Sequence, residues 1–162
     1  MRSDPRTMIY CVDTSSLIAA WQERYPIENF PKFWDRMNGL VEDGRLISPI
    51  EVFNEIKKRS DDLHDWLRRR KDGMFRELDD EVQIEVANVL QRFPRLVGDK
   101  KLRTSADPFV IALARITGHQ LVTEEKPTGS LSRPNIPDVC AQLSISTIGI
   151  LQVIQREKWV AG

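Results

Sequence analysis

The feature that most constrains this sequence is an apolar run at residues 8–12 that ends directly on an aspartate, Asp13. Such a run, partly β-branched, is typical of a short buried strand, and the residues that follow predict the start of a helix. In an open α/β sheet, ligands bind in the crevice beyond the carboxyl ends of the strands. Asp13 is therefore either a site residue or the N-cap of that helix, since aspartate is a favoured cap.

The rest of the chain alternates short apolar segments with amphipathic helices. We expect further strands at 45–48, 119–123 and 144–146, with helices between them. Because the strands are too short and too apolar for a half-exposed sheet, the pattern predicts a parallel sheet with helices on both faces. The expected fold is a helix-rich three-layer α/β/α sandwich with four to five strands, formed by a single domain over residues 1–162 in which 1–7 is a flexible N-terminus.

Composition narrows the functional classes. The chain has 162 residues with 24 basic and 24 acidic side chains, so any nucleic-acid binding must use a local patch rather than a global positive field. The two cysteines lack the spacing of a metal site and suit a reducing compartment. No apolar run is long enough to cross a membrane, and the N-terminus has no signal-peptide core. We expect a soluble, cytoplasmic protein.

Several acids fall where the predicted strands end or the following helices begin. Asp13 follows the first strand, Glu55 lies in the helix after the second, and Asp107 opens a central apolar helix. Glu124 and Glu125 follow the strand at 119–123.

Two of these regions also have a purely structural interpretation. Ser48 and Glu51 match a capping box with Pro49 at the first helical position, and Asp107 before Pro108 matches an N-cap. Glu55 has no such role.

Carboxylates gathered at one edge of a sheet raise one another's pKa and resist joint ionisation unless a cation is present. Oxygen-only ligands favour Mg²⁺ or Mn²⁺ over Zn²⁺. A hard metal held this way serves phosphodiester hydrolysis by activating water. His64 and His119 fit structural positions better than a catalytic triad, and glycine-rich phosphate loops are absent.

These residues resemble the PIN domain, the metal-dependent nuclease fold of VapC-type toxins, in what looks like a less-studied PIN-like subgroup. The resemblance lies in the opening strand and acid at 12–18, the second acid at 51–56, the helix at 106–114 and the motif at 121–125. It implies an endoribonuclease in which water attacks the scissile phosphate. The family also implies a small antitoxin partner and frequent homodimers.

By this resemblance, the catalytic and metal-binding residues are Asp13, Glu55, Asp107 and Glu125. Thr14, Ser15 and Thr123 are expected beside them. The family's last motif usually reads Thr, any residue, Asp, whereas Thr123 here precedes Glu124 and Glu125. Glu125 matches by position, but Glu124 or Asp138 remains an alternative fourth acid.

Three alternatives remain open. An aspartate-nucleophile phosphatase requires an acid two residues after the first, where this chain has Ser15; a metal-dependent adhesion site requires a hydroxyl where it has Leu17. A PIN-like module that binds RNA or protein without cutting it is the third. For RNA contacts, the candidates are the basic runs at 57–59, 68–71 and 100–101.

Overall fold

A five-stranded, all-parallel sheet forms the centre of the molecule, in the order β3-β2-β1-β4-β5. The computed structural model describes residues 8–96 and 106–160, so the expected flexible segment at 1–7 and the basic run at 100–101 lie outside the described residues. The strands are β1 (Tyr10–Val12), β2 (Leu46–Pro49), β3 (Phe75–Arg76), β4 (Gln120–Val122) and β5 (Thr147–Ile148).

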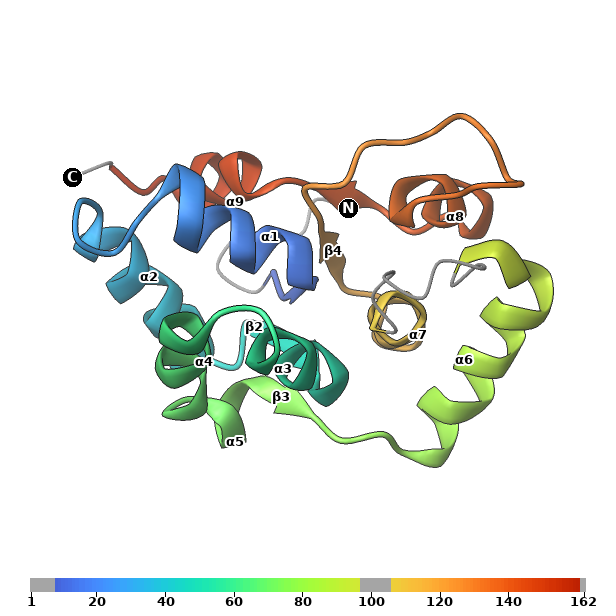
Figure 1. The fold of residues 1–162 in the computed structure, drawn as a ribbon, viewed down its shortest axis with the longest axis horizontal. Coiled ribbons are helices and arrows are strands. Elements are labelled where there is room, and N and C mark those ends of the chain that lie inside the picture. The colour runs from blue at the N-terminus through green and yellow to red at the C-terminus, as the bar shows by residue number, and fades with distance from the viewer. Residues whose placement is uncertain (1–7, 97–105, 161–162) are drawn as a thin grey trace.

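Helices connect consecutive strands, and a final helix follows β5 (Figure 1). They are α1 (Thr14–Ala19), continued by the π-helical turn η2 (Ala20–Arg24), α2 (Pro31–Glu42), α3 (Ile50–Lys57), α4 (Asp61–Arg68), α5 (Lys71–Met74), α6 (Asp80–Arg92), the 3₁₀ turn η3 (Pro94–Leu96), α7 (Asp107–Thr117), α8 (Ile136–Leu143) and α9 (Ile150–Glu157). Among them, no helix combines the length and the apolar character that crossing a bilayer requires.

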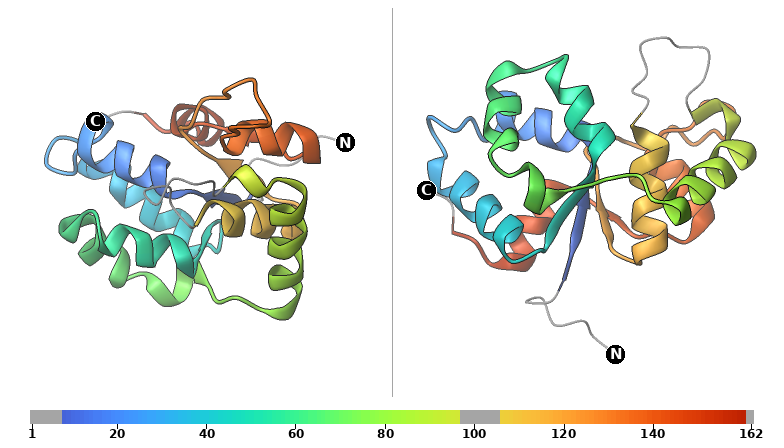
Figure 2. Two further views of the ribbon diagram at one scale, coloured as in Figure 1. Left: turned by 45° about the vertical axis from the view of Figure 1, so that its right-hand side comes forward. Right: turned by 90° about the horizontal axis from the view of Figure 1, so that it is seen from below.

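The helices lie on both sides of the sheet. Figure 2 (right) shows α2, α3 and α4 on one side of the strands and α6 and α7 on the other. The helix-rich three-layer α/β/α architecture expected from the sequence is therefore confirmed. Since α1 and α3 follow β1 and β2 directly, and α7 leads back to the start of β4, all three helices begin at the carboxyl edge of the sheet.

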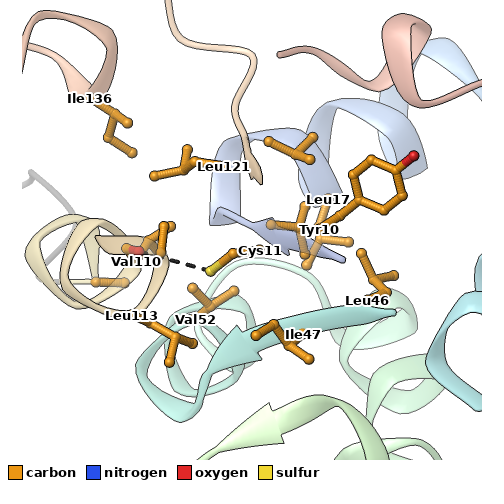
Figure 3. Close-up of a cluster of buried hydrophobic side chains, with 14 of the residues drawn as sticks. Tyr10, Cys11, Leu17, Leu46, Ile47, Val52, Val110, Leu113, Leu121 and Ile136 are labelled. Atoms are coloured by element: carbon orange, nitrogen blue, oxygen red, sulfur yellow. Dashed lines mark hydrogen bonds between the residues drawn. The ribbon is translucent and has the colours of Figure 1, made fainter. Parts of the chain in front are cut away.

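The core surrounds β1, whose three residues are fully buried. Figure 3 shows Cys11 of β1 between Val110 of α7, Val52 of α3 and Leu121 of β4; its thiol lies 3.8 Å from the Val110 carbonyl oxygen. Because β1 is central, flanking strands and helices on both faces exclude water from it. Asp13, the residue directly after β1, is itself fully buried.

Two predicted helix caps are wrong. Ser48 belongs to β2 and donates its hydroxyl to the Val12 carbonyl oxygen at 2.7 Å, so Pro49 is the N-cap residue of α3 and no capping box forms with Glu51. Asp107 is the first residue of α7, and Ala106 is its N-cap. In both places a partner distant in sequence is present: Val12 accepts the Ser48 hydroxyl, and Glu55 accepts the N–H of the Ala106 N-cap.

Three other elements differ from the sequence prediction. The short strand β3 and the helix α8 were not expected, and the last strand lies at 147–148 rather than 144–146. Ser144 ends α8 with a left-handed backbone, φ 57°, which is incompatible with a strand. The charged segment at 61–71 is not one continuous helix, because α4 ends at Arg68 and α5 begins at Lys71.

Candidate functional site

Asp13 has the most enclosed carboxylate of the candidate acids, with no exposed surface. Its Oδ1 accepts the backbone N–H of Ser16 at 2.8 Å, which makes Asp13 the N-cap of α1. Its Oδ2 accepts the hydroxyls of Ser15 at 2.8 Å and Thr123 at 2.6 Å. The capping prediction is thus confirmed, and the Thr123 contact ties the exit of β4 to the exit of β1.

Burial raises the pKa of the Asp13 carboxyl, and the hydrogen bonds from Thr123, Ser16 and Ser15 act in the opposite direction. The sequence led us to expect repulsion between carboxylates as the cause of such a shift. The main cause is instead the loss of hydration. A cation beside Asp13 would stabilise the charged form that burial disfavours.

The Glu55 side chain, on α3, contacts the start of α7. Its Oε2 accepts the backbone N–H of Ala106 at 3.1 Å, so the carboxylate of α3 occupies the N-terminal end of the neighbouring helix. Asp107 follows Ala106 and is 8% exposed. The positive end of the α7 dipole favours both negative charges at this position. The structure therefore brings Glu55 and the first turn of α7 together across 51 residues of sequence.

The two glutamates after β4 diverge toward different helices. Glu125 Oε1 accepts the backbone N–H of Ile136 at the start of α8, at 3.0 Å. Glu124 Oε1 accepts the backbone N–H of Ile150 at the start of α9, also at 3.0 Å, and its Oε2 lies 3.5 Å from Arg24 Nη1.

The backbone of both glutamates connects to Asp13 through a shared hydroxyl. The Thr123 hydroxyl oxygen also accepts the Glu125 N–H at 3.0 Å, and the Ser15 hydroxyl oxygen also accepts the Glu124 N–H at 3.4 Å. The two side chains then separate, that of Glu125 toward α8 and that of Glu124 toward α9.

Asp138 closes the loop before α8. Its carboxylate accepts hydrogen bonds from the Thr128 N–H and hydroxyl, the Gly129 N–H and the Asn135 N–H, at 2.8 to 3.1 Å. The backbone N–H donors and the Thr128 hydroxyl lower the pKa of this carboxyl, although burial opposes them. With Asn135 it forms a capping box, so the structure gives Asp138 a role in holding residues 128–135.

The donor chemistry around Asp13 suits a hard divalent cation. Carboxylate and hydroxyl oxygens predominate, and the buried Thr14 hydroxyl has no hydrogen-bond partner within the described ranges. Within the described residues, 8–96 and 106–160, however, no three His, Cys, Asp or Glu side chains are grouped closely enough to hold one ion. Mg²⁺ commonly uses one or two carboxylates together with water and substrate phosphate. The residues fit that mode of binding, not a preformed cage of four carboxylates.

One residue beside the acids was not predicted to lie there. Cys140 of α8 is buried, and burial raises the pKa of its thiol to about 12, with Asp13 and Glu125 contributing in the same direction. Its sequence pattern indicates only a small buried hydrophobe, which agrees with its burial. No local signal in the sequence places it near the acids.

The basic run at 68–71 has structural contacts of its own. The Arg70 guanidinium lies 3.7 Å from the centre of the Trp66 ring and donates to Asn38 Oδ1 at 2.6 Å. Arg68 pairs with Asp65 on the surface of α4. These contacts assign Arg70 to packing, whereas the residues at 57–59 are exposed.

Comparisons with known proteins give a family and a fold. A family model described as "Domain of unknown function (DUF4411)" matches residues 10–161, and no curated protein matches the sequence. The crystal structure of VapBC2 from Rickettsia felis, bound to a DNA fragment from their promoter, is 10% identical over 88% of this chain and 98% of that chain, with a TM-score of 0.53.

PAE2754 from Pyrobaculum aerophilum is 19% identical over 85% of this chain and 97% of that chain; its TM-score of 0.31 is too low to establish a shared fold. The similarity to the VapBC2 structure shows that this chain and the matched chain of that structure share a fold.

Proposed function

The chain belongs to the DUF4411 family, and we propose that it is a metal-dependent endoribonuclease with a PIN-like fold. The observation that carries the proposal is the position of Asp13: a fully buried carboxylate, raised in pKa, at the carboxyl end of the central strand. Such an enclosed acid, held by hydroxyls and close to Glu125, is costly to keep charged unless it binds a cation.

In this proposal Asp13, Glu55, Asp107 and Glu125 are the protein ligands of Mg²⁺ or Mn²⁺. One or two of these carboxylates bind an ion, and water and substrate phosphate complete its coordination. The ion would supply an activated water and neutralise charge on the leaving oxygen. Thr123 and Ser15 hold the Asp13 carboxylate in one orientation, and the start of α8 holds Glu125. Glu124 is less suited as a ligand because Arg24 Nη1 lies 3.5 Å from its Oε2, and Asp138 because the loop at 128–135 engages both of its oxygens.

The biological setting belongs to the same proposal. The VapBC2 structure contains an assembly bound to its promoter DNA, and its shared fold supports a role for this chain as the toxin of a toxin-antitoxin pair. An antitoxin protein would then be its partner and RNA its substrate. A homodimer and a cytoplasmic location are expected on the same ground.

The test is RNA cleavage by the purified protein with Mn²⁺ or Mg²⁺. We expect cleavage to require the metal and to be abolished in Asp13→Asn and in Asp107→Asn, each with an unchanged circular dichroism spectrum. The matched control is Asp72→Asn, which removes an exposed acid of α5 and should leave the rate unchanged. Undiminished cleavage in both site variants would refute the proposal.

One observation favours a second candidate, a PIN-like module that binds RNA or protein without cutting it. No three acids are grouped for a metal within the described residues. That candidate predicts RNA binding that neither metal nor Asp13→Asn affects. Hydrolysis of a small phosphomonoester with no action on RNA would instead identify a phosphatase.

A further inference from the structure

An open pocket lies immediately beside the acids that follow β4. Its volume is about 410 Å³, within the range of roughly 300–1,000 Å³ typical of small-molecule sites. The loop after β4 forms one wall and the first turn of α9 forms the other. Thr123, Glu124 and Glu125 line it, so a ligand in the pocket lies next to the proposed catalytic residue Glu125.

Both walls are fixed by hydrogen bonds rather than by packing alone. On the loop side, the Asn135 side chain donates to the Lys126 carbonyl oxygen at 2.8 Å, and Asp138 holds the backbone of Thr128 and Gly129. On the α9 side, Glu124 holds the Ile150 N–H. Because these bonds already exist, the pocket is preformed, and a ligand would spend little free energy on ordering it.

Backbone N–H groups and one arginine partly offset the negative charges of Glu124 and Glu125. Each carboxylate accepts a backbone N–H at the start of a helix, where the dipole is positive, and Glu124 also lies 3.5 Å from Arg24. The pocket therefore suits a ligand that carries both an anionic group and N–H donors, because carboxylate oxygens accept from N–H groups.

The rim combines three kinds of contact. Lys126 is an exposed cation, Thr147 and Gln152 carry polar groups, and Leu151 presents an apolar side chain that is 54% exposed. A phosphate would pair with Lys126, the edge of a base would bind carboxylate and amide groups, and the face of the base would lie against Leu151. One nucleotide has all of these groups.

We propose that this pocket binds a single nucleotide of the RNA strand next to the cleaved bond and thereby selects the cleavage site. The inference rests on the proposed function, whose substrate it specifies. It predicts a preference at one position of the RNA, because only one nucleotide contacts the pocket.

The test maps cleavage sites of the wild-type protein in an RNA library of random sequence, with Mn²⁺. We expect at least about a ten-fold preference for one base at one position, which is within the discrimination that a well-placed side-chain contact to a base provides. Thr147→Val and Gln152→Ala remove polar groups that can contact the edge of a base and should reduce that preference to less than about three-fold. Lys126→Ala should slow cleavage of all sequences alike, because a phosphate contact carries no information about the base. Gln142→Ala removes a similarly exposed glutamine outside the pocket and should retain the preference.

The outcomes separate the two proposals. Cleavage without any base preference, or a preference that both Thr147→Val and Gln152→Ala retain, would overturn the pocket assignment and leave the nuclease intact. If the wild-type protein cuts no RNA, titration with the four nucleoside 5′-monophosphates decides the question. Amide shifts at Thr147 and Gly149 for one of them would support a nucleotide pocket, and no shifts with any would overturn it. Tighter binding of a monophosphate than of short RNA would also overturn it.

Discussion

Replacing Thr123 by valine tests the hydrogen-bonded link between the two strand exits. Valine has nearly the same shape, so the change removes the hydroxyl without opening a cavity. That hydroxyl is 2.6 Å from Asp13 Oδ2, to which it donates, and 3.0 Å from the Glu125 nitrogen, whose N–H it accepts, in a residue that is 6% exposed.

The expected loss follows from these two bonds. A hydrogen bond to a charged group contributes about 1.5–3 kcal/mol and a neutral one about 0.5–1.5 kcal/mol. We therefore expect the free energy of unfolding to fall by about 2–4 kcal/mol. For a chain of this size that corresponds to a decrease in Tm of roughly 5–15 °C, measurable by calorimetry or circular dichroism.

The matched control is Thr117→Val. The Thr117 hydroxyl donates to the Leu113 carbonyl oxygen of its own helix at 2.6 Å, and that carbonyl has backbone partners of its own, so the cost should stay below about 1 kcal/mol. Equal Tm values for the two variants would show that the Thr123 hydroxyl does not link Asp13 to β4, which would refute the reasoning.

Three further predictions concern charge. Asp13→Asn should be more stable than the wild type at neutral pH without metal. The pKa of Asp13 is raised in the folded state, so its ionisation lowers the free energy of unfolding as pH rises above the ordinary carboxyl pKa. Equal stability of the two proteins in denaturant titrations from pH 4 to 8 would contradict this. Asp138→Asn should have a lower free energy of unfolding than the wild type at neutral pH. This difference should vanish as pH falls below about 4 and through the lowered pKa of Asp138. A difference that does not depend on pH would contradict a charge effect. Saturating Mn²⁺, at about 100 times its Kd, should stabilise the wild type by about 2.7 kcal/mol, and a flat melting temperature would speak against a metal site at Asp13.

The fold was predictable because its signals are local. The apolar run at 8–12, the amphipathic helices and the left-handed Gly118 at the end of α7 are each encoded within a few residues. Alternating short strands and helices then leave a parallel sheet as the arrangement that buries both faces. For the same reason the cap was one of the two roles that the sequence predicted for Asp13, since its partner Ser16 is three residues away.

Local rules failed where a distant segment supplied a better partner. Asp107 looks like an N-cap from its neighbours alone, yet Glu55 of α3 binds the start of that helix. Ser48 looks like a cap too, but β1 lies beside it and its hydroxyl bonds to Val12. The left-handed Ser144 and the short β3 depend on tertiary contacts in the same way, because two or three residues carry too little periodicity to specify an element.

The sequence by itself determined the alternation of strands and helices apart from β3 and α8, the parallel sheet and the placement of acids near its carboxyl edge. Only the tertiary structure decided how those acids are held: Asp13 with Thr123 across 110 residues, Glu55 with Ala106 across 51, and Glu124 and Glu125 at the starts of different helices. Periodicity and capping arise from interactions over one or two turns, whereas the partner of a buried carboxylate depends on which distant backbone groups the packed layers bring within hydrogen-bonding distance.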